Sequence, residues 1–218
     1  FPGKKTPSCA ETLAAAGIAR VVCASLDPNP KVAGRGLAVL RSAGAKTVRL
    51  PEFQADAEAL NRGFYSRMRR GRPWVILKTA LSLDGKAAAA SGKSRWVTGK
   101  QSRSAVHRLR AECDAIMVGA GTVLADDPAL TSHGAGKNPL RVVIAGRRRL
   151  PLNARVLDSA APTLVYLTKN RLDLNGILWD LASRGVGVVL VEGGPTLHAS
   201  FLRAGLVDEV KVFLAPKL

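Results

Sequence analysis

Short apolar runs alternate with amphipathic stretches along most of the chain. An apolar run of about four to eight residues between turn formers predicts a buried strand. Such runs occupy residues 20–25, 46–50, 74–81, 115–118, 140–144, 163–167, 186–191 and 209–214. Apolar residues at helical spacing predict helices over residues 9–19, 36–43, 58–70, 101–112 and 196–204. This alternation of strands and helices predicts an α/β fold with a parallel sheet.

A change of pattern at Gly71-Arg72-Pro73 predicts a boundary between two domains, residues 1–71 and residues 72–218. The helix before the boundary is increasingly basic, and the strand from Trp74 begins a second set of α/β elements. The chain starts without an initiator methionine, and its last predicted strand has nothing after it to cover it. We therefore expect a fragment of a longer protein, with the second domain incomplete at its C-terminus.

The amino-acid composition gives the chain a strong positive charge. The 218 residues include 33 Lys and Arg against 16 Asp and Glu, a formal net charge of +17, and 47% of them are hydrophobic. That apolar content can bury a core, which excludes a disordered basic tail. No apolar run reaches the roughly 18 residues of a membrane helix, so we expect no membrane partner. The charge favours a nucleic acid or small phosphorylated ligands as partners.

The charge is spread over both predicted domains, with 12 basic and 5 acidic residues in 1–71 and 21 and 11 in 72–218. Between Asp84 and Glu112 there is no acid, whereas basic residues recur. This stretch is either an ordinary solvated face or a surface that faces phosphate. The arginine clusters at residues 67–72 and 147–149 lack the interleaved aromatic rings of nucleic-acid platforms. We therefore expect no nucleic-acid partner.

Three cysteines, Cys9, Cys23 and Cys113, are too few and too scattered for a disulfide framework. Their spacing favours reduced thiols in a cytoplasmic protein. A lone cysteine at the start of a helix, such as Cys9, is more often a core thiol than a metal ligand.

Three glycine-bearing turns follow apolar strands, at residues 82–86, 119–128 and 191–196. Glycines let the backbone approach a ligand closely, and a Gly-Gly turn that leads into a helix suits a diphosphate. The G-x-G-x-x-G dinucleotide fingerprint is absent, and each turn alone is typical of a plain turn. Together with the acid-free basic stretch, the three turns predict an anionic cofactor.

The same turns also carry a resemblance to a known family. The segments 77–85, 94–98, 121–131 and 191–197, with the ending 205–218, resemble the reductase half of the bifunctional riboflavin-biosynthesis deaminase–reductase. Residues 3–10 and Asp27-Pro28-Asn29-Pro30 resemble the second half of its deaminase domain. The resemblance covers essentially the whole chain. It implies a remnant of a cytidine-deaminase-like α/β domain in residues 1–71, followed by a dihydrofolate-reductase-like α/β domain in residues 72–218.

The resemblance implies a multifunctional enzyme of riboflavin biosynthesis. Its zinc deaminase half hydrolyses an amino group of a phosphorylated diaminopyrimidine, and its reductase half uses NADPH to reduce 5-amino-6-(5-phosphoribosylamino)uracil to the ribitylamino product. Cys9 matches one of the two zinc-binding cysteines, and the other ligands and the catalytic glutamate are not in this sequence. Because one thiolate cannot make a tetrahedral site, we expect zinc only in the full-length protein and no deaminase activity here. A homo-oligomer is compatible with the resemblance.

The resemblance also assigns site residues in the second domain. Lys78, Asp126 and Glu192 are the candidates for proton handling. The expected NADPH contacts are Ala80, Trp96, Thr122, Asp126, Gly146, Gly194, Pro195, Thr196, Leu197, His198, Ala199 and Ser200. The expected contacts to the phosphorylated pyrimidine are Ser94, Arg110, Leu130, His133 and Glu192. From the residues alone, Trp96 is equally a core residue, and Asp126 is equally a turn cap.

Two departures from the family pattern bear on these assignments. His133 stands where many relatives have a further arginine, so a phosphate contact there requires a protonated imidazole or nearby Lys137. Ala145-Gly146 replaces the usual Asp-Ser or Asp-Gly, which puts a cofactor hydrogen bond there in question. His107 and His198 have no metal-like spacing and are interpreted as surface or cap residues. A basic nucleic-acid-binding module and a non-catalytic relative of the reductase remain the alternative hypotheses.

Overall fold

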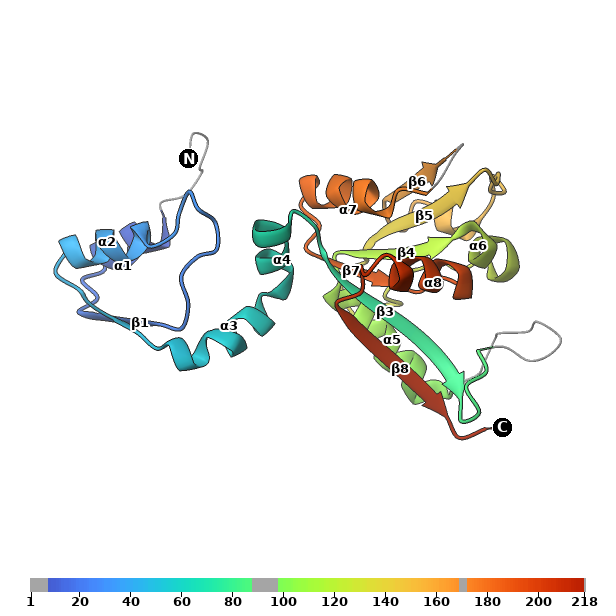
Figure 1. Cartoon of the computed structure of the whole chain (residues 1–218), viewed down its shortest axis with the longest axis horizontal. Helices are drawn as coiled ribbons and strands as arrows, with labels where there is room; N and C mark the ends of the chain where they lie inside the picture. Colours follow the sequence, from blue (N-terminus) through green and yellow to red (C-terminus); the bar gives the residue numbers. More distant parts are fainter. Residues whose placement is uncertain (1–7, 88–97, 169–171, 218) are drawn as a thin grey trace. The chain divides into compact units, whose positions relative to one another are not determined.

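The computed structural model describes residues 8–87, 98–168 and 172–217. The chain forms two compact units, Phe1–Gly71 and Arg72–Leu218, which are described separately below (Figure 1). Among the described residues, no helix combines the length and the apolar character that a membrane span requires.

The first unit is a small α/β arrangement. Its elements are α1 (Cys9–Ala15), β1 (Arg20–Cys23), α2 (Arg35–Ser42), β2 (Lys46–Arg49), the short η1 (Pro51–Phe53), α3 (Gln54–Leu60) and α4 (Arg62–Arg70). Strands β1 and β2 pair in parallel. Ser8 and Glu11 form a reciprocal capping box that starts α1. The helix predicted over 58–70 is wrong in its bounds, because Asn61 separates α3 from α4.

The second unit is built on a six-stranded parallel sheet with the order β6-β5-β4-β7-β3-β8. Its strands are β3 (Trp74–Ser82), β4 (Ala115–Gly119), β5 (Leu140–Gly146), β6 (Thr163–Leu167), β7 (Val188–Val191) and β8 (Glu209–Ala215). Its helices are α5 (Lys100–Glu112), α6 (Ala120–Asp126), α7 (Leu174–Ser183) and α8 (Pro195–Arg203), with the short η2 (Arg155–Leu157) before β6. The predicted α/β class with a parallel sheet is confirmed.

Helices cover both faces of this sheet, which explains why its inner strands are apolar throughout. Ala115 and Met117 of β4 pack in one cluster with the apolar residues of α7 and α8. Ile116 and Val118, the alternate residues of the same strand, face a second cluster that includes Val123 of α6. A third cluster joins α5 to β3 and β7. The carboxyl ends of the strands therefore emerge between two helical layers.

Two helices differ from the sequence-based expectation. Residues 119–128 were expected as a loop, but residues 120–126 form α6, because Val123 completes an apolar cluster under the sheet. Helix α7 was not expected, although Leu174, Ile177, Leu178 and Leu181 follow the helical spacing and are buried. The Asp173 side chain accepts a hydrogen bond from the Gly176 amide and starts this helix.

Candidate functional site

The candidate site lies where the parallel strands of the second unit end. In an open parallel sheet, loops at the carboxyl ends of the strands are the usual place for ligands. Two cavities lie there, of about 480 Å³ and about 410 Å³, called below the first and the second cavity. Asp126, the last residue of α6, lines both of them. A ligand in either cavity therefore reaches the same carboxylate.

The first cavity crosses the ends of β4, β5, β6 and β7. Its wall combines the start of α6, the end of β5, the residue after β6 and the turn between β7 and α8. The lining residues are Gly119, Ala120, Gly121, Thr122, Ala125, Asp126, Ile144, Ala145, Gly146, Arg148, Thr168, Leu172, Gly194, Pro195, Thr196, Leu197 and Ser200. This wall spans the ends of four strands and combines bare backbone with apolar and polar side chains, a lining that suits a nucleotide.

The turn into α8 is shaped by two glycines. A Cβ at Gly193 would lie 2.6 Å from Leu197 Cδ2, so no side chain fits there while Leu197 fills the core. A Cβ at Gly194 would lie 3.7 Å from Thr122 Oγ1, which places this turn directly against α6. Pro195 is the first residue of α8, where its fixed φ suits a helix start. The turn thus brings bare backbone and a helix N-terminus to the cavity wall, the arrangement that holds a diphosphate.

The second cavity is strongly cationic. It adjoins β3, α5, the segment after α6 and η2. Its lining residues are Lys78, Ala80, Thr98, Arg103, His107, Arg110, Asp126, Asp127, Pro128, Ala129, Leu130, His133 and Arg155. Four of these side chains are arginine or lysine and two more are histidine, against two aspartates, so the cavity favours an anionic ligand.

Arg110 is held in the wall of the second cavity by a buried carboxylate. Its Nε and Nη2 donate to Glu192 Oε1 and Oε2, each at 2.9 Å, and its Nη1 donates to the Thr131 carbonyl at 3.1 Å. Lys78 Nζ lies 3.8 Å from Glu192 Oε2. Burial alone would raise the pKa of Glu192, but the hydrogen bonds and charges of Arg110 and Lys78 lower it. Glu192 is therefore ionised, and it binds Arg110 and faces Lys78, two cations in the wall of the second cavity.

His107 and His133 form a stacked pair in the second cavity, with ring centroids 4.3 Å apart and planes 27° apart. Burial lowers the pKa of both imidazoles. The positive charge of Arg110 lowers both pKa values further. For His107, the charges of His133 and Arg103 also lower the pKa, whereas Glu192 raises it. For His133, the charge of Arg155 lowers the pKa as well. The pair is therefore neutral at pH 7. The interpretation of His107 as a surface or cap residue was wrong.

The backbone beside this cavity adopts a costly conformation. Asp127, Leu130 and His133 have positive φ angles of 40°, 51° and 50°, and all three line the second cavity. Left-handed φ angles in residues other than glycine persist only where the surroundings fix them, and they concentrate at functional sites.

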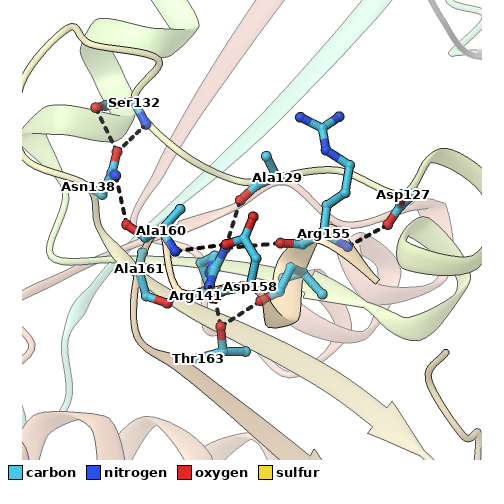
Figure 2. A network of polar contacts seen from close by, with 11 residues as sticks. Asp127, Ala129, Ser132, Asn138, Arg141, Arg155, Asp158, Ala160, Ala161 and Thr163 are labelled. Atoms are coloured by element: carbon cyan, nitrogen blue, oxygen red, sulfur yellow. Dashed lines mark hydrogen bonds and ion pairs between the residues drawn. The ribbon is translucent and has the colours of Figure 1, made fainter. Parts of the chain in front are cut away.

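A buried arginine fixes this strained segment, as Figure 2 shows. Arg141 of β5 is fully buried. Its Nη1 donates to the Ala129 carbonyl at 3.3 Å and to the Arg155 carbonyl at 3.2 Å. It also binds Asp158 Oδ1 at 2.8 Å, Thr163 Oγ1 through Nε, and the carbonyls of Asp158 and Ala161 through Nη2. The Arg155 amide in turn donates to Asp127 Oδ1 at 2.8 Å. Arg141 therefore ties η2 to the segment that carries Asp127 and Leu130.

The structure brings most of the predicted site residues together. Thr122, Asp126, Gly146, Gly194, Pro195, Thr196, Leu197 and Ser200 line the first cavity. Lys78, Ala80, Arg110, Asp126, Leu130 and His133 line the second cavity, so Ala80, expected at the cofactor, lies on the other side of Asp126. Glu192, His198 and Ala199 line neither cavity. Ser94 and Trp96 lie outside the described residues.

His198, interpreted as a surface or cap residue, is half-buried in the structure. Its Nε2 is buried without a hydrogen-bond partner in the described part of the chain, and burial lowers its pKa. Sequence reasoning also missed several lining residues, above all Arg148, Arg103 and Arg155. Arg103 and Arg148 belong to basic stretches and Arg155 stands alone between apolar residues, so the charge pattern did not tell a cavity residue from a solvated one.

The arginines at residues 69–72 take part in the fold. Arg69 pairs with both oxygens of Glu58, and Arg70 donates to Ser66. Arg72 binds both oxygens of Asp208 at 2.6 and 2.8 Å in the second unit. Intramolecular partners therefore account for three members of this cluster.

Cys9 begins α1 in the first unit, where it is exposed. With Cys23 and Asp27 it lines a cavity of about 580 Å³. Within the described residues, no group of three or more His, Cys, Asp and Glu side chains is placed to hold a metal ion.

Comparison with known proteins identifies the family to which the chain belongs. The family described as the RibD C-terminal domain matches residues 73–218. The chain belongs to the RibD family. It is 40% identical to riboflavin biosynthesis protein RibD of Escherichia coli and 37% identical to that of Aquifex aeolicus. Each match covers 98% of this chain but only 67% and 66% of the relative, so the chain spans about two thirds of the RibD proteins that it matches.

Solved RibD structures share the fold. Acinetobacter baumannii RibD superposes with a TM-score of 0.89 at 36% identity, over 99% of this chain and 66% of that one. A Thermotoga maritima protein described as a diaminohydroxyphosphoribosylaminopyrimidine deaminase/5-amino-6-(5-phosphoribosylamino)uracil reductase gives 0.89 at 34% identity, over 99% and 65%. The resemblance to the riboflavin-biosynthesis deaminase–reductase family is thus confirmed.

Proposed function

We propose that residues 72–218 form an NADPH-dependent reductase domain that converts 5-amino-6-(5-phosphoribosylamino)uracil to its ribitylamino product in riboflavin biosynthesis. The observation that carries this proposal is the junction of two different cavities at Asp126. One cavity has the bare backbone that the diphosphate of a dinucleotide needs, and the other has the charge that a phosphorylated substrate needs. A hydride transfer requires such a junction, because donor and acceptor carbons must come into contact.

The residues of the first cavity fit the cofactor. The turn at Gly193 and Gly194 presents backbone N–H groups at the start of α8, where a diphosphate would bind. Thr122 stands opposite this turn and can donate a hydroxyl. The nicotinamide end would then lie toward Asp126, next to the second cavity.

The residues of the second cavity fit the substrate. Arg110 presents a guanidinium fixed by Glu192, and Arg103 and Arg155 line the same cavity. A phosphate group on the ribose chain would be bound by such a set of cations. The His107–His133 pair would contribute hydrogen bonds when neutral and charge when protonated.

When bound, NADPH supplies the hydride. The carbon that accepts it becomes electrophilic when the neighbouring nitrogen or oxygen receives a proton or a hydrogen bond. Lys78 is the proton donor best placed for this role, because its ammonium group lines the second cavity beside ionised Glu192. Asp126, at the junction, would orient the two partners. Glu192, expected as a proton-handling and substrate-binding residue, would instead hold the side chains of Arg110 and Lys78 in position.

Consumption of NADPH by the purified chain in the presence of 5-amino-6-(5-phosphoribosylamino)uracil tests this function. We expect turnover that requires the substrate phosphate and that falls strongly in Lys78→Met. The dephosphorylated nucleoside is the matched control, and equal turnover of both compounds would contradict the assignment of the cationic cavity. Absence of turnover with intact binding of both ligands would support the non-catalytic alternative.

For residues 1–71 we propose the C-terminal part of a zinc deaminase domain, in a cytoplasmic protein. Cys9 would supply one thiolate ligand, and in this chain it has no further ligands grouped around it within the described residues. The three free thiols suit a reducing compartment. We expect the chain to bind no stoichiometric zinc, and metal analysis of the purified protein checks this.

A further inference from the structure

The arginine run at residues 147–149 follows β5 at the edge of the first cavity. Only the middle residue, Arg148, lines that cavity. Its amide donates to the Ala145 carbonyl at 3.0 Å in a tight turn, and Gly146 within this turn has a φ of 60°. A Cβ at Gly121 would lie 3.5 Å from Arg148 Nη1, so the guanidinium folds back over the start of α6. The turn thus directs one of three successive arginines inward.

The position of Arg148 along the first cavity is set by the sheet order. Asp126 marks the end that adjoins the second cavity, and Gly194 marks the turn after β7. From there the cavity continues across β4 to the ends of β5 and β6, where Gly146, Arg148 and Thr168 lie. A dinucleotide with its nicotinamide at Asp126 and its diphosphate at Gly194 would therefore place its adenosine ribose beside Arg148.

The charge at this end of the cavity discriminates between the two nicotinamide cofactors. Sites that prefer NADH place a carboxylate on the ribose hydroxyls, whereas an arginine there accommodates a 2′-phosphate. Asp126 is the only acid among the described lining residues, and it lies at the opposite end. Within the described ranges, the Arg148 guanidinium has no carboxylate partner. A fork of donors without a counter-ion matches a phosphate dianion.

We propose that Arg148 binds the 2′-phosphate of the cofactor and makes this chain select NADPH over NADH. The inference rests on the proposed function, because it requires a dinucleotide in the first cavity. It also explains how the chain recognises this end of the cofactor although Ala145-Gly146 replaces the polar residues usual in the family.

Calorimetric titration with 2′,5′-ADP (adenosine 2′,5′-bisphosphate) and 5′-AMP tests the inference without any turnover, because the two probes differ only in the 2′-phosphate. In the wild-type chain we expect 2′,5′-ADP to bind about tenfold or more tightly than 5′-AMP. Arg148→Gln should remove most of that difference and leave 5′-AMP within about twofold of its wild-type affinity. Arg149→Gln removes the same charge from the same turn, but Arg149 does not line the cavity, so it should keep the preference.

The outcomes separate this inference from the function on which it rests. A wild-type chain that binds both probes equally would overturn the role of Arg148 but leave a nucleotide site in place. An equal loss of both probes in Arg148→Gln, or the same selective loss in Arg149→Gln, would also overturn it, since the effect would then be general electrostatic attraction. Absence of binding by either probe would overturn both proposals. The ratio of kcat/KM for NADPH and NADH should follow the binding data.

Discussion

Arg110 and Glu192 form a two-pronged ion pair that joins α5 to the end of β7. The side chains are 12% and 8% exposed, so the pair is shielded from water. Removing one partner of such a pair leaves the other charge buried and uncompensated, which is far costlier than losing a surface pair. The same carboxylate also faces Lys78. One buried anion thus holds two cations at the wall of the second cavity.

Glu192→Gln should impair turnover much more than cofactor binding. The amide keeps the shape and one acceptor but loses the charge, so Arg110 and Lys78 lose their fixed positions. We expect kcat/KM for the phosphorylated substrate to fall by about tenfold or more, because one disrupted charged hydrogen bond costs roughly 1.5–3 kcal/mol. The dissociation constant of NADPH should stay within about twofold, since Glu192 lines neither cavity. Steady-state kinetics and a fluorescence titration measure the two quantities.

The first unit offers a matched control for this substitution. Arg69 binds both oxygens of Glu58 with the same two-pronged geometry, but the Arg69 side chain is 49% exposed. Because solvent screens such a pair, Glu58→Gln should leave the melting temperature almost unchanged, whereas Glu192→Gln should lower it by several degrees. Equal shifts in both variants would contradict the role given to burial.

The histidine pair should make the second unit less stable as the pH falls below about 6.5. Burial and neighbouring cations lower the pKa of His107 and His133 in the folded chain. The unfolded chain therefore takes up protons first as the pH falls, and the free energy of unfolding decreases through that window. His133→Asn removes one titrating group, and asparagine tolerates the positive φ at this position. Melting temperatures at pH 7.5 and 5.5 should differ less in this variant than in the wild-type chain, and an unchanged difference would count against the assignment.

Arg141 should be needed for substrate binding as well as for stability. Arg141→Lys keeps a positive charge, but a single ammonium cannot replace a guanidinium that bonds η2, Ala129 and Thr163 together. We expect a loss of about 3–5 kcal/mol in the free energy of unfolding, measured by urea titration, because several buried acceptors lose their donor. In the protein that remains folded, the KM for the phosphorylated substrate should rise more than the dissociation constant of NADPH. Equal changes would indicate a purely structural role.

The sequence pattern predicted the parallel sheet well, because strands such as β4 and β5 are buried on both faces and carry continuous apolar runs. It failed at α6, where Gly119 and Gly121 suggested a loop but the buried Val123 favours a helix. The ion pair of Arg110 with Glu192 and the stacking of His107 on His133 join residues distant along the chain, so local patterns could not reveal them. Motif resemblance supplied Arg110 and His133 as site residues but not Arg148, whose role depends on the turn that directs it inward.

Gly193→Ala should weaken cofactor binding through a single methyl group. The added Cβ would lie 2.6 Å from Leu197 Cδ2 and 3.0 Å from Leu197 Cβ, and Leu197 belongs to the first turn of α8 and to the core. Leu197 Cβ is fixed to the helix backbone, so a rotamer change cannot relieve both contacts and the turn must shift. A shift of the turn displaces the backbone N–H groups that would bind the diphosphate, and we expect NADPH affinity to fall by about tenfold or more. Gly99→Ala is the matched control, because its Cβ meets nothing within 4 Å and its φ of −74° suits any residue. Titration of both variants with NADPH measures the two affinities. Wild-type affinity in Gly193→Ala would contradict the proposal that this turn binds the cofactor.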